Sequence, residues 1–278
     1  MKIHSTYQGA SGRESTFDLT LSPLRKNGDL VIFCHGYKGF KDWGVWNLVA
    51  EKFANQGLDF LKFNFSHNGG TVENPIDFPD EQAFAENSYS KELEDIGHIW
   101  ELVKNGIAID GECRKYRSVH LIGHSRGGGV AVLAVVKYGS FKTLTTWSAV
   151  ADFGERFNFD MEKWKETGIT HIKNARTGQM LPHNYSYYQD YLANQHALDI
   201  LTAAKKVSIP WLIAHGDRDE AVSFDNAERL NSAMDSSKLL PVLHTGHTFG
   251  ASHPWRKKEL PQALNGLCEK TIEFIKAY

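Results

Sequence analysis

The sequence predicts an α/β fold with a mostly parallel sheet and helices on both of its faces. Three observations lead to this prediction: short apolar runs, amphipathic stretches between them, and a regular alternation of the two. The apolar runs are mostly rich in branched and aromatic residues, as is typical of strands buried on both faces. Strands that alternate with helices form a mostly parallel sheet. With 278 residues, the chain is expected to form a single domain over 1–278.

The expected elements follow one another along the chain. Residues 1–24 include the alternating run STFDLTLS, which indicates antiparallel edge strands. Strands of the parallel sheet are expected at 30–36, 58–66, 118–125, 143–150, 209–217 and 237–246. Helices are expected between and after them at 45–57, 91–106, 128–139, 226–234 and 266–278.

One segment, residues 151–195, interrupts this alternation. It is too long for an ordinary connection between a strand and a helix. Two interpretations are open: a lid over a site, or a solvent-exposed insertion that forms a helical hairpin of its own. Because the segment follows the C-terminal end of a strand, where open α/β sheets bind ligands, we expect an inserted cap. Its aromatic residues, among them Trp164 and Tyr188, would either contact an apolar acyl group or pack the cap onto the body.

The composition restricts the classes of partner. Lys and Arg number 31 and Asp and Glu number 33, so no overall charge favours nucleic acid or an anionic membrane surface. A small-molecule or short-peptide substrate is expected by default, and the oligomeric state stays open. The chain contains no apolar run of about 18 residues and no signal-like start, so a cytoplasmic protein is expected. Three scattered cysteines indicate neither a disulfide framework nor a zinc site.

The stretch LIGHSRGGG, residues 121–129, is the strongest indication of chemistry. It contains Gly-x-Ser-x-Gly between an expected strand and an expected helix. In a nucleophile elbow the serine takes a strained turn, and the flanking glycines avoid collisions with the neighbouring strand and helix. Ser125 would then lie at a helix N-terminus, where free N–H groups favour developing negative charge. The alternative interpretation is an ordinary turn.

A serine hydroxyl needs a base and a carboxylate before it can act as a nucleophile. Two carboxylates, Asp217 and Asp219, follow one expected strand. Three histidines follow the next one: His244, His247 and His253. The order serine, acid, histidine is the one expected when the serine stands in a nucleophile elbow. At this point both acids and all three histidines remain candidates.

These motifs resemble those of the α/β-hydrolases, and the resemblance covers nearly the whole chain. It is nearest to the esterases and the prolyl-oligopeptidase-like hydrolases. The matching residues are His35-Gly36, Gly123 to Gly127, His215 to Asp219 with Val222, and Gly246 to Phe249. The resemblance implies an α/β-hydrolase fold with an inserted cap at 151–195.

The same resemblance implies roles for particular residues. Ser125 would be the nucleophile, Asp219 the acid and His247 the base, while the N–H groups of Tyr37 and Arg126 would form an oxyanion hole. Asp217 would instead stabilise the turn or cap a helix. For the two other histidines, His244 is expected to belong to the strand and His253 is the rival base.

The implied reaction is the hydrolysis of a carboxylic ester through an acyl-enzyme, without a metal or other cofactor. A peptidase or amidase, an acyltransferase, and a binding protein without turnover remain alternatives. The loop HGYKG differs from the HGGG of one lipase and esterase branch, so a lipase is not expected. Further along this loop, Lys38, Lys41 and Asp42 would either touch a substrate or form a solvated or ion-paired loop.

Overall fold

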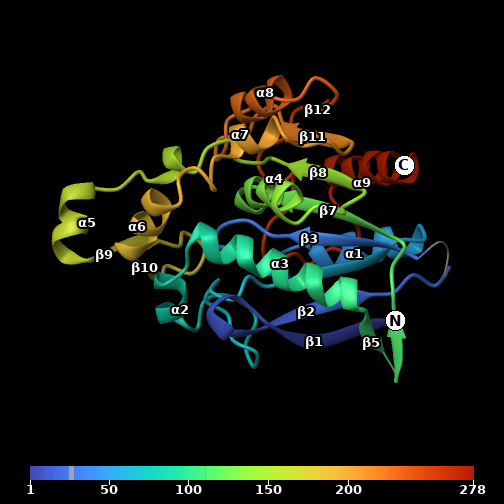
Figure 1. The fold of residues 1–278 in the computed structure, drawn as a ribbon, viewed down its shortest axis with the longest axis horizontal. Helices are drawn as coiled ribbons and strands as arrows, with labels where there is room; N and C mark the ends of the chain where they lie inside the picture. The colour runs from blue at the N-terminus through green and yellow to red at the C-terminus, as the bar shows by residue number, and fades with distance from the viewer. Residues whose placement is uncertain (25–27, 110) are drawn as a thin grey trace.

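A computed structural model describes residues 1–24, 28–109 and 111–278 and confirms the predicted α/β class (Figure 1). The main sheet contains eight strands. They are β1 Lys2–Gln8, β2 Glu14–Thr20, β3 Asp29–Cys34, β4 Asp59–Phe63, β7 Ser118–His124, β8 Thr143–Trp147, β11 Trp211–Gly216 and β12 Lys238–Val242. Their order across the sheet is β1-β2-β4-β3-β7-β8-β11-β12.

The pairing of the strands agrees with the expected topology. From β4 to β12 every neighbouring pair is parallel, whereas β1 pairs with β2 and β2 with β4 in antiparallel register. The predicted strands end later than the observed ones, because apolar residues beyond the strands are also buried. Phe65 after β4 and Ala149 after β8 both belong to the core.

Helices cover both faces of the sheet (Figure 1). On one face lie α1 Trp46–Asn55 and α9 Gln262–Lys276, which pack in one core cluster. The other face holds α3 Tyr89–Asn105, α4 Arg126–Tyr138, α7 Ile200–Ala204 and α8 Asp225–Ser232. The short helix α7 and the small hairpin of β5 Ile107–Ile109 and β6 Glu112–Arg114 were not expected, because so few residues carry no clear periodicity.

The segment between β8 and α7 contains a β-hairpin flanked by two short helices. Its elements are α5 Met161–Thr167, β9 Ile169–Lys173, β10 Met180–Asn184 and α6 Ser186–Ala193. Its alternative interpretation as a helical hairpin is therefore wrong, since exposure alternates along β9 as in a strand that is half buried. The hairpin lies at one end of the molecule, beyond α3 (Figure 1).

A segment of the body that was not predicted holds the hairpin in place. Helix α2, Glu81–Ala85, contacts β10, and a separate apolar cluster forms around this contact. Its buried members are Phe40, Phe78, Phe84 and Leu181. Burying one such side chain contributes about 1.5–3 kcal/mol, so this cluster is a substantial anchor for the hairpin.

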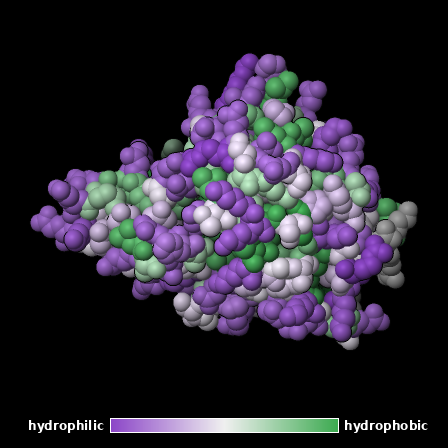
Figure 2. All heavy atoms as spheres, turned by 45° about the horizontal axis from the view of Figure 1, so that its top comes forward, coloured by the Kyte–Doolittle hydropathy of each residue, from purple (hydrophilic) through white to green (hydrophobic). Residues whose placement is uncertain are grey.

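The surface of the hairpin region is mixed in character. Figure 2 shows hydrophilic residues at its outer end and over much of the body, with hydrophobic residues between them. None of the helices in the described part of the chain is long and apolar enough to cross a membrane.

A buried network of charges lies beneath the loop that follows β3. Lys41 and Lys62 have fully buried side chains, and their ammonium groups lie 2.8 and 2.5 Å from the two carboxylate oxygens of Asp18. Asp42 contacts both lysines. Burial raises the pKa of Asp18, but Lys62 and Lys41 outweigh it and hold this pKa below its usual range. Lys41 and Asp42 thus belong to an ion-paired loop, one of the two alternatives that the sequence left open.

We expect Asp18→Ala to lower the free energy of unfolding by about 3–5 kcal/mol, because it leaves two buried ammonium groups with one carboxylate between them. Urea denaturation at pH 7, followed by circular dichroism, measures this loss. Asp235 is exposed, and Asp235→Ala serves as a control with an expected change within about 0.5 kcal/mol. A loss for Asp18→Ala no larger than that of the control would contradict the prediction.

Candidate active site

Ser125 lies in a strained turn between β7 and α4. Its φ of 58° and ψ of −123° lie outside the regions that non-glycine residues favour. Two glycines make this turn possible, since a Cβ on Gly123 would lie 2.4 Å from the carbonyl oxygen of Gly127. A Cβ on Gly127 would lie 2.3 Å from the carbonyl oxygen of His35. The turn is therefore a tightly packed elbow, as the sequence predicts, and the serine stands at the N-terminus of a 13-residue helix.

The two further glycines of LIGHSRGGG let α4 pack closely against the chain that follows β8. A Cβ on Gly128 would lie 2.5 Å from the Cβ of Ala149. One on Gly129 would lie 2.8 Å from side-chain atoms of Ile200 and Val150. Residues 128 and 129 must therefore be glycines for α4 to pack this closely next to the elbow.

His247 connects Ser125 to Asp219. Its Nε2 atom lies 2.9 Å from Ser125 Oγ, and its Nδ1 atom lies 2.8 Å from Asp219 Oδ2. When Nδ1–H donates to the carboxylate, Nε2 is left to accept a proton from the serine hydroxyl. The structure thus brings together the three residues to which the resemblance assigned these roles.

Asp219 is held in one orientation by its own loop. Its Oδ1 atom accepts hydrogen bonds from the amides of Ala221 and Val222, each at 2.9 Å. Burial raises the pKa of Asp219, but His215, His247 and the Val222 amide outweigh it and hold this pKa well below its usual range. The carboxylate is therefore ionised where it faces the imidazole.

The rival acid and the rival histidines have other contacts. Asp217 is exposed, and its Oδ1 accepts a hydrogen bond from the amide of Thr245, the turn-stabilising role that the sequence suggested. His253 Nδ1 accepts from the amide of Gly44 at 2.7 Å. The expectation that His244 belongs to the strand is wrong, because β12 ends at Val242 and His244 has a left-handed φ of 60°.

His124 supports the backbone of His247. Its Nε2 atom lies 2.9 Å from the carbonyl oxygen of His247, and the two rings are 4.8 Å apart. Burial, together with the nearby His247, lowers the pKa of His124 to about 3, so the ring is neutral near pH 7. His124 therefore holds the backbone of His247 through a hydrogen bond as a neutral ring.

The backbone at Gly36 and Tyr37 approaches the serine closely. A Cβ on Gly36 would lie 2.8 Å from the Cβ of Ser125. Arg126 begins α4 directly after the serine. Among the described residues, the amides of Tyr37 and Arg126 donate no hydrogen bond. Both therefore remain available to a group that binds at Ser125.

The side chain of Arg126 is a feature that the sequence did not indicate. It is buried, with Nη1 3.1 Å from Glu92 Oε1 and its guanidinium 4.1 Å from the ring centre of Tyr37. Burial lowers the pKa of Arg126, but Tyr187 and Glu92 outweigh it, so the group stays charged. Its partners come from distant segments of the chain, and no local motif could have indicated them.

A cavity of about 420 Å³ opens beside Ser125, between the body and the cap. The body contributes Tyr37, Lys38, Arg126 and His247, and the cap contributes Phe153, Arg156, Phe159, Ile172, His183 and Tyr187. Segment 151–195 thus forms part of the wall of this site. A second cavity of about 120 Å³ also reaches Ser125 and His247, and it is lined by Trp43, Trp46 and His124 among others.

Trp164 and Tyr188, which were expected to contact substrate, do not line either cavity. Trp164 is 1% exposed, and its Nε1–H donates to the carbonyl of His183 at 2.9 Å. Tyr188 packs against Phe157 and Trp164. The two side chains instead pack against other residues of the cap, which differs from both interpretations that the sequence left open, while the adjacent Tyr187 faces the cavity.

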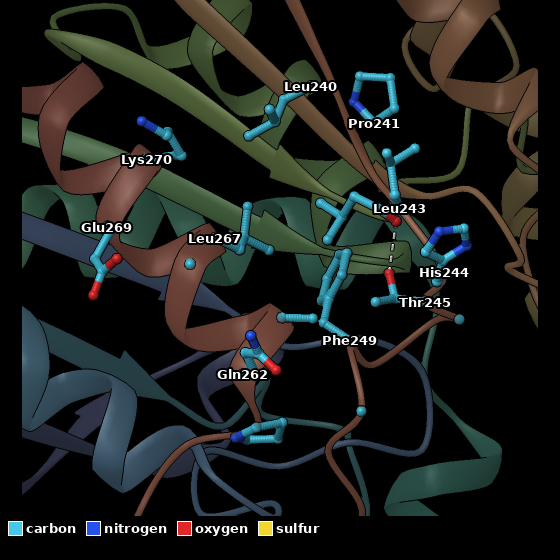
Figure 3. A pocket seen from close by; sticks show the side chains of 16 residues that line it. Leu240, Pro241, Leu243, His244, Thr245, Phe249, Gln262, Leu267, Glu269 and Lys270 are labelled. Carbon is cyan, nitrogen blue, oxygen red and sulfur yellow. Dashed lines mark hydrogen bonds between the residues drawn. The ribbon is translucent and has the colours of Figure 1, made fainter.

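A larger cavity of about 810 Å³ lies between β12 and α9 (Figure 3). Apolar side chains such as Leu240, Leu243 and Phe249 line it together with Glu269 and Lys270. Within the described part of the chain, none of the three residues of the hydrogen-bonded chain at Ser125 lines it. We therefore take the 420 Å³ cavity as the candidate site, because Ser125 and His247 line it, although it is the smaller of the two.

No protein-family model and no curated protein matches this sequence. Solved structures do match in three dimensions. The esterase Est1E from Butyrivibrio proteoclasticus has a TM-score of 0.72 and 18% identity, covering 99% of this chain and 98% of its own. The esterase domain of a Rhodothermus marinus protein has a TM-score of 0.68 and 15% identity, covering 100% and 99%. A dienelactone hydrolase from Anabaena variabilis has a TM-score of 0.65 and 15% identity, covering 100% and 98%.

These three structures are α/β-hydrolases, and the match runs along essentially the whole of each chain. The protein therefore has the α/β-hydrolase fold, as the resemblance of its motifs implied. At identities below 20% the match concerns the fold, and the chemistry has to be argued from the site.

Proposed function

We propose that the protein is a serine hydrolase that cleaves small carboxylic esters through an acyl-enzyme intermediate. The observation that carries this proposal is the continuous hydrogen-bonded chain Asp219–His247–Ser125, with contacts of 2.8 and 2.9 Å. The strained serine, the helix N-terminus and the adjacent cavity favour the same function. The volume of about 420 Å³ lies within the range of small-molecule sites.

In the proposed reaction, His247 Nε2 takes the proton of Ser125 as Oγ attacks the acyl carbon. Asp219 orients the imidazole and stabilises its protonated form. The N–H groups of Tyr37 and Arg126 would stabilise the negative oxygen of the tetrahedral intermediate. His247 then returns the proton to the departing alcohol. A water molecule, deprotonated by the same imidazole, cleaves the acyl-enzyme and frees the acid. These steps use only side chains and backbone groups of this chain.

The choice of an ester as substrate has support from the structural neighbours. Two of them are esterases, and one of these, Est1E, has also been solved with ferulic acid bound. An ester is also easier to cleave than an amide with the same acyl group, since an alcohol is the better leaving group. Amide hydrolysis and acyl transfer to another nucleophile are distinguished by product analysis.

The purified protein is expected to hydrolyse 4-nitrophenyl acetate and butyrate and to react with a fluorophosphonate probe. Peptide mass spectrometry should locate the label on Ser125, because its Oγ lies 2.9 Å from His247 Nε2 and lines the cavity at the N-terminus of α4. Product analysis in the presence of added alcohols and amines separates hydrolysis from acyl transfer. A folded protein that neither turns over an ester nor reacts with the probe would contradict the proposed function.

A further inference from the structure

The 420 Å³ cavity beside Ser125 carries an excess of positive charge. Lys38, Arg126 and Arg156 line it, whereas no Asp or Glu of the described residues does. The chain as a whole has a formal net charge of −2, so this excess is local. A cavity lined by one sign of charge attracts a ligand of the other sign.

Two of the three cations have no acidic partner. Arg126 is paired with Glu92, but neither Lys38 nor Arg156 forms a salt bridge within residues 1–24, 28–109 and 111–278. Arg156 Nη2 donates to the backbone carbonyl of Ala221 at 3.0 Å and keeps its remaining N–H groups for another acceptor. Burial, together with the charge of Arg126, lowers the pKa of Lys38. An anion bound near Lys38 and Arg126 would offset the repulsion between these two positive charges.

Two cap residues in the wall of the same cavity also carry buried polar atoms that lack a hydrogen-bond partner within the described residues. His183 and Tyr187 both line it and are 2% and 3% exposed. Among the described residues, His183 Nδ1 and the Tyr187 hydroxyl have no hydrogen-bond partner. His183 Nε2 lies 2.6 Å from the Tyr37 hydroxyl, and burial lowers the pKa of His183 to about 3. When the tyrosine donates to Nε2, the neutral ring carries its proton on Nδ1 and can donate to an acceptor.

We propose that this protein selects esters that carry a carboxylate, with the anionic part of the substrate bound in the cap cavity by Lys38, Arg126 and Arg156. The inference rests on the proposed function and specifies its substrate class. Arginine suits this task because its planar group matches a carboxylate with two parallel hydrogen bonds. The second cavity of about 120 Å³, lined in part by Trp43 and Trp46, would take a small uncharged group of the substrate.

The test compares anionic esters with neutral ones of the same size. Monoethyl adipate and its primary amide, ethyl 5-carbamoylpentanoate, differ only in the charge at the acyl end. The acetate ester of 5-hydroxypentanoate and its amide place the same difference on the alcohol side. We expect kcat/KM to favour the carboxylate by at least about tenfold in one of the two pairs. Equal values within each pair would overturn the proposal.

Calorimetric titration of the same four compounds into Ser125→Ala, which keeps the cavity, separates this proposal from the proposed function. We expect the favoured carboxylate to bind at least about tenfold tighter than its amide. Such binding without turnover by the wild type would contradict ester hydrolysis and support the anion site. Turnover of all four esters with equal affinities would support hydrolysis and overturn the anion site.

Arg156→Gln tests the residue at the exposed edge of the cavity, where a folding defect is least expected. The preference for the carboxylate over the amide should fall at least about threefold in this variant. Lys165→Gln is the matched control, since it removes one positive charge from an exposed position on the cap helix α5 that does not line the cavity. An equal loss of preference in both variants would assign the effect to the overall charge and overturn the role of Arg156.

Discussion

Ser125→Ala is expected to lower kcat for ester hydrolysis by roughly four to six orders of magnitude. The alcohol oxygen that would attack the acyl carbon is lost, and His247 Nε2 loses the group that lies 2.9 Å away. The remaining rate would come from substrate binding and from the amides that stabilise the oxyanion. Initial rates with 4-nitrophenyl butyrate measure the change, and labelling by the fluorophosphonate should disappear.

This loss should occur without unfolding. The strained φ of residue 125 is set by the elbow, and alanine meets the same steric restriction as serine there. The thermal midpoint of Ser125→Ala should therefore stay close to that of the wild type. Ser140, an exposed serine that also has a left-handed φ of 60°, is the control, and Ser140→Ala should keep full activity. A Ser125→Ala protein that still hydrolyses esters at more than about a hundredth of the wild-type rate would contradict the assignment.

The body of the fold and the residues around Ser125 could be predicted because their signals are local. A buried parallel strand has a continuous apolar run, and each of the six expected strands is found. The elbow depends on glycines two residues either side of Ser125, so its packing requirement is visible in five consecutive letters. The acid and the histidine follow strand ends, where a parallel sheet directs its loops to one edge.

The wall of the cavity could not be predicted because it depends on contacts between distant segments. Tyr187 and Tyr188 are adjacent in sequence, and only the packing of a short cap helix turns the first into the cavity and the second onto Phe157. The pairing of Arg126 on α4 with Glu92 on α3 joins two residues that are 34 positions apart in the sequence. Neither arrangement leaves a periodic pattern in the sequence. Helix α2, which anchors the cap hairpin, is only five residues long, so it too carries no clear periodicity.

Asp219→Asn is expected to lower kcat by about 10⁴-fold, and the hydrogen bonds around this residue explain why an isosteric change should be so severe. Oδ1 of Asp219 accepts from the amides of Ala221 and Val222. An asparagine would keep its carbonyl oxygen at this position, since an NH₂ group there would face two donors. Its NH₂ group would then face His247 Nδ1 and require that nitrogen to be the acceptor. The ring proton would move to Nε2, and the imidazole could no longer accept the proton of Ser125.

Asp217→Asn is the matched control, because it makes the same chemical change two residues away in the same loop. Asp217 is exposed and accepts from the amide of Thr245, which an asparagine carbonyl can also accept. Its kcat should stay within about twofold of the wild type, in line with a surface substitution that keeps its contact. Steady-state kinetics on both variants decide between the two acids. A larger loss in Asp217→Asn than in Asp219→Asn would mean that the acid acts from the other side of the turn, and that the 2.8 Å contact between Asp219 and His247 is not the one that supports catalysis.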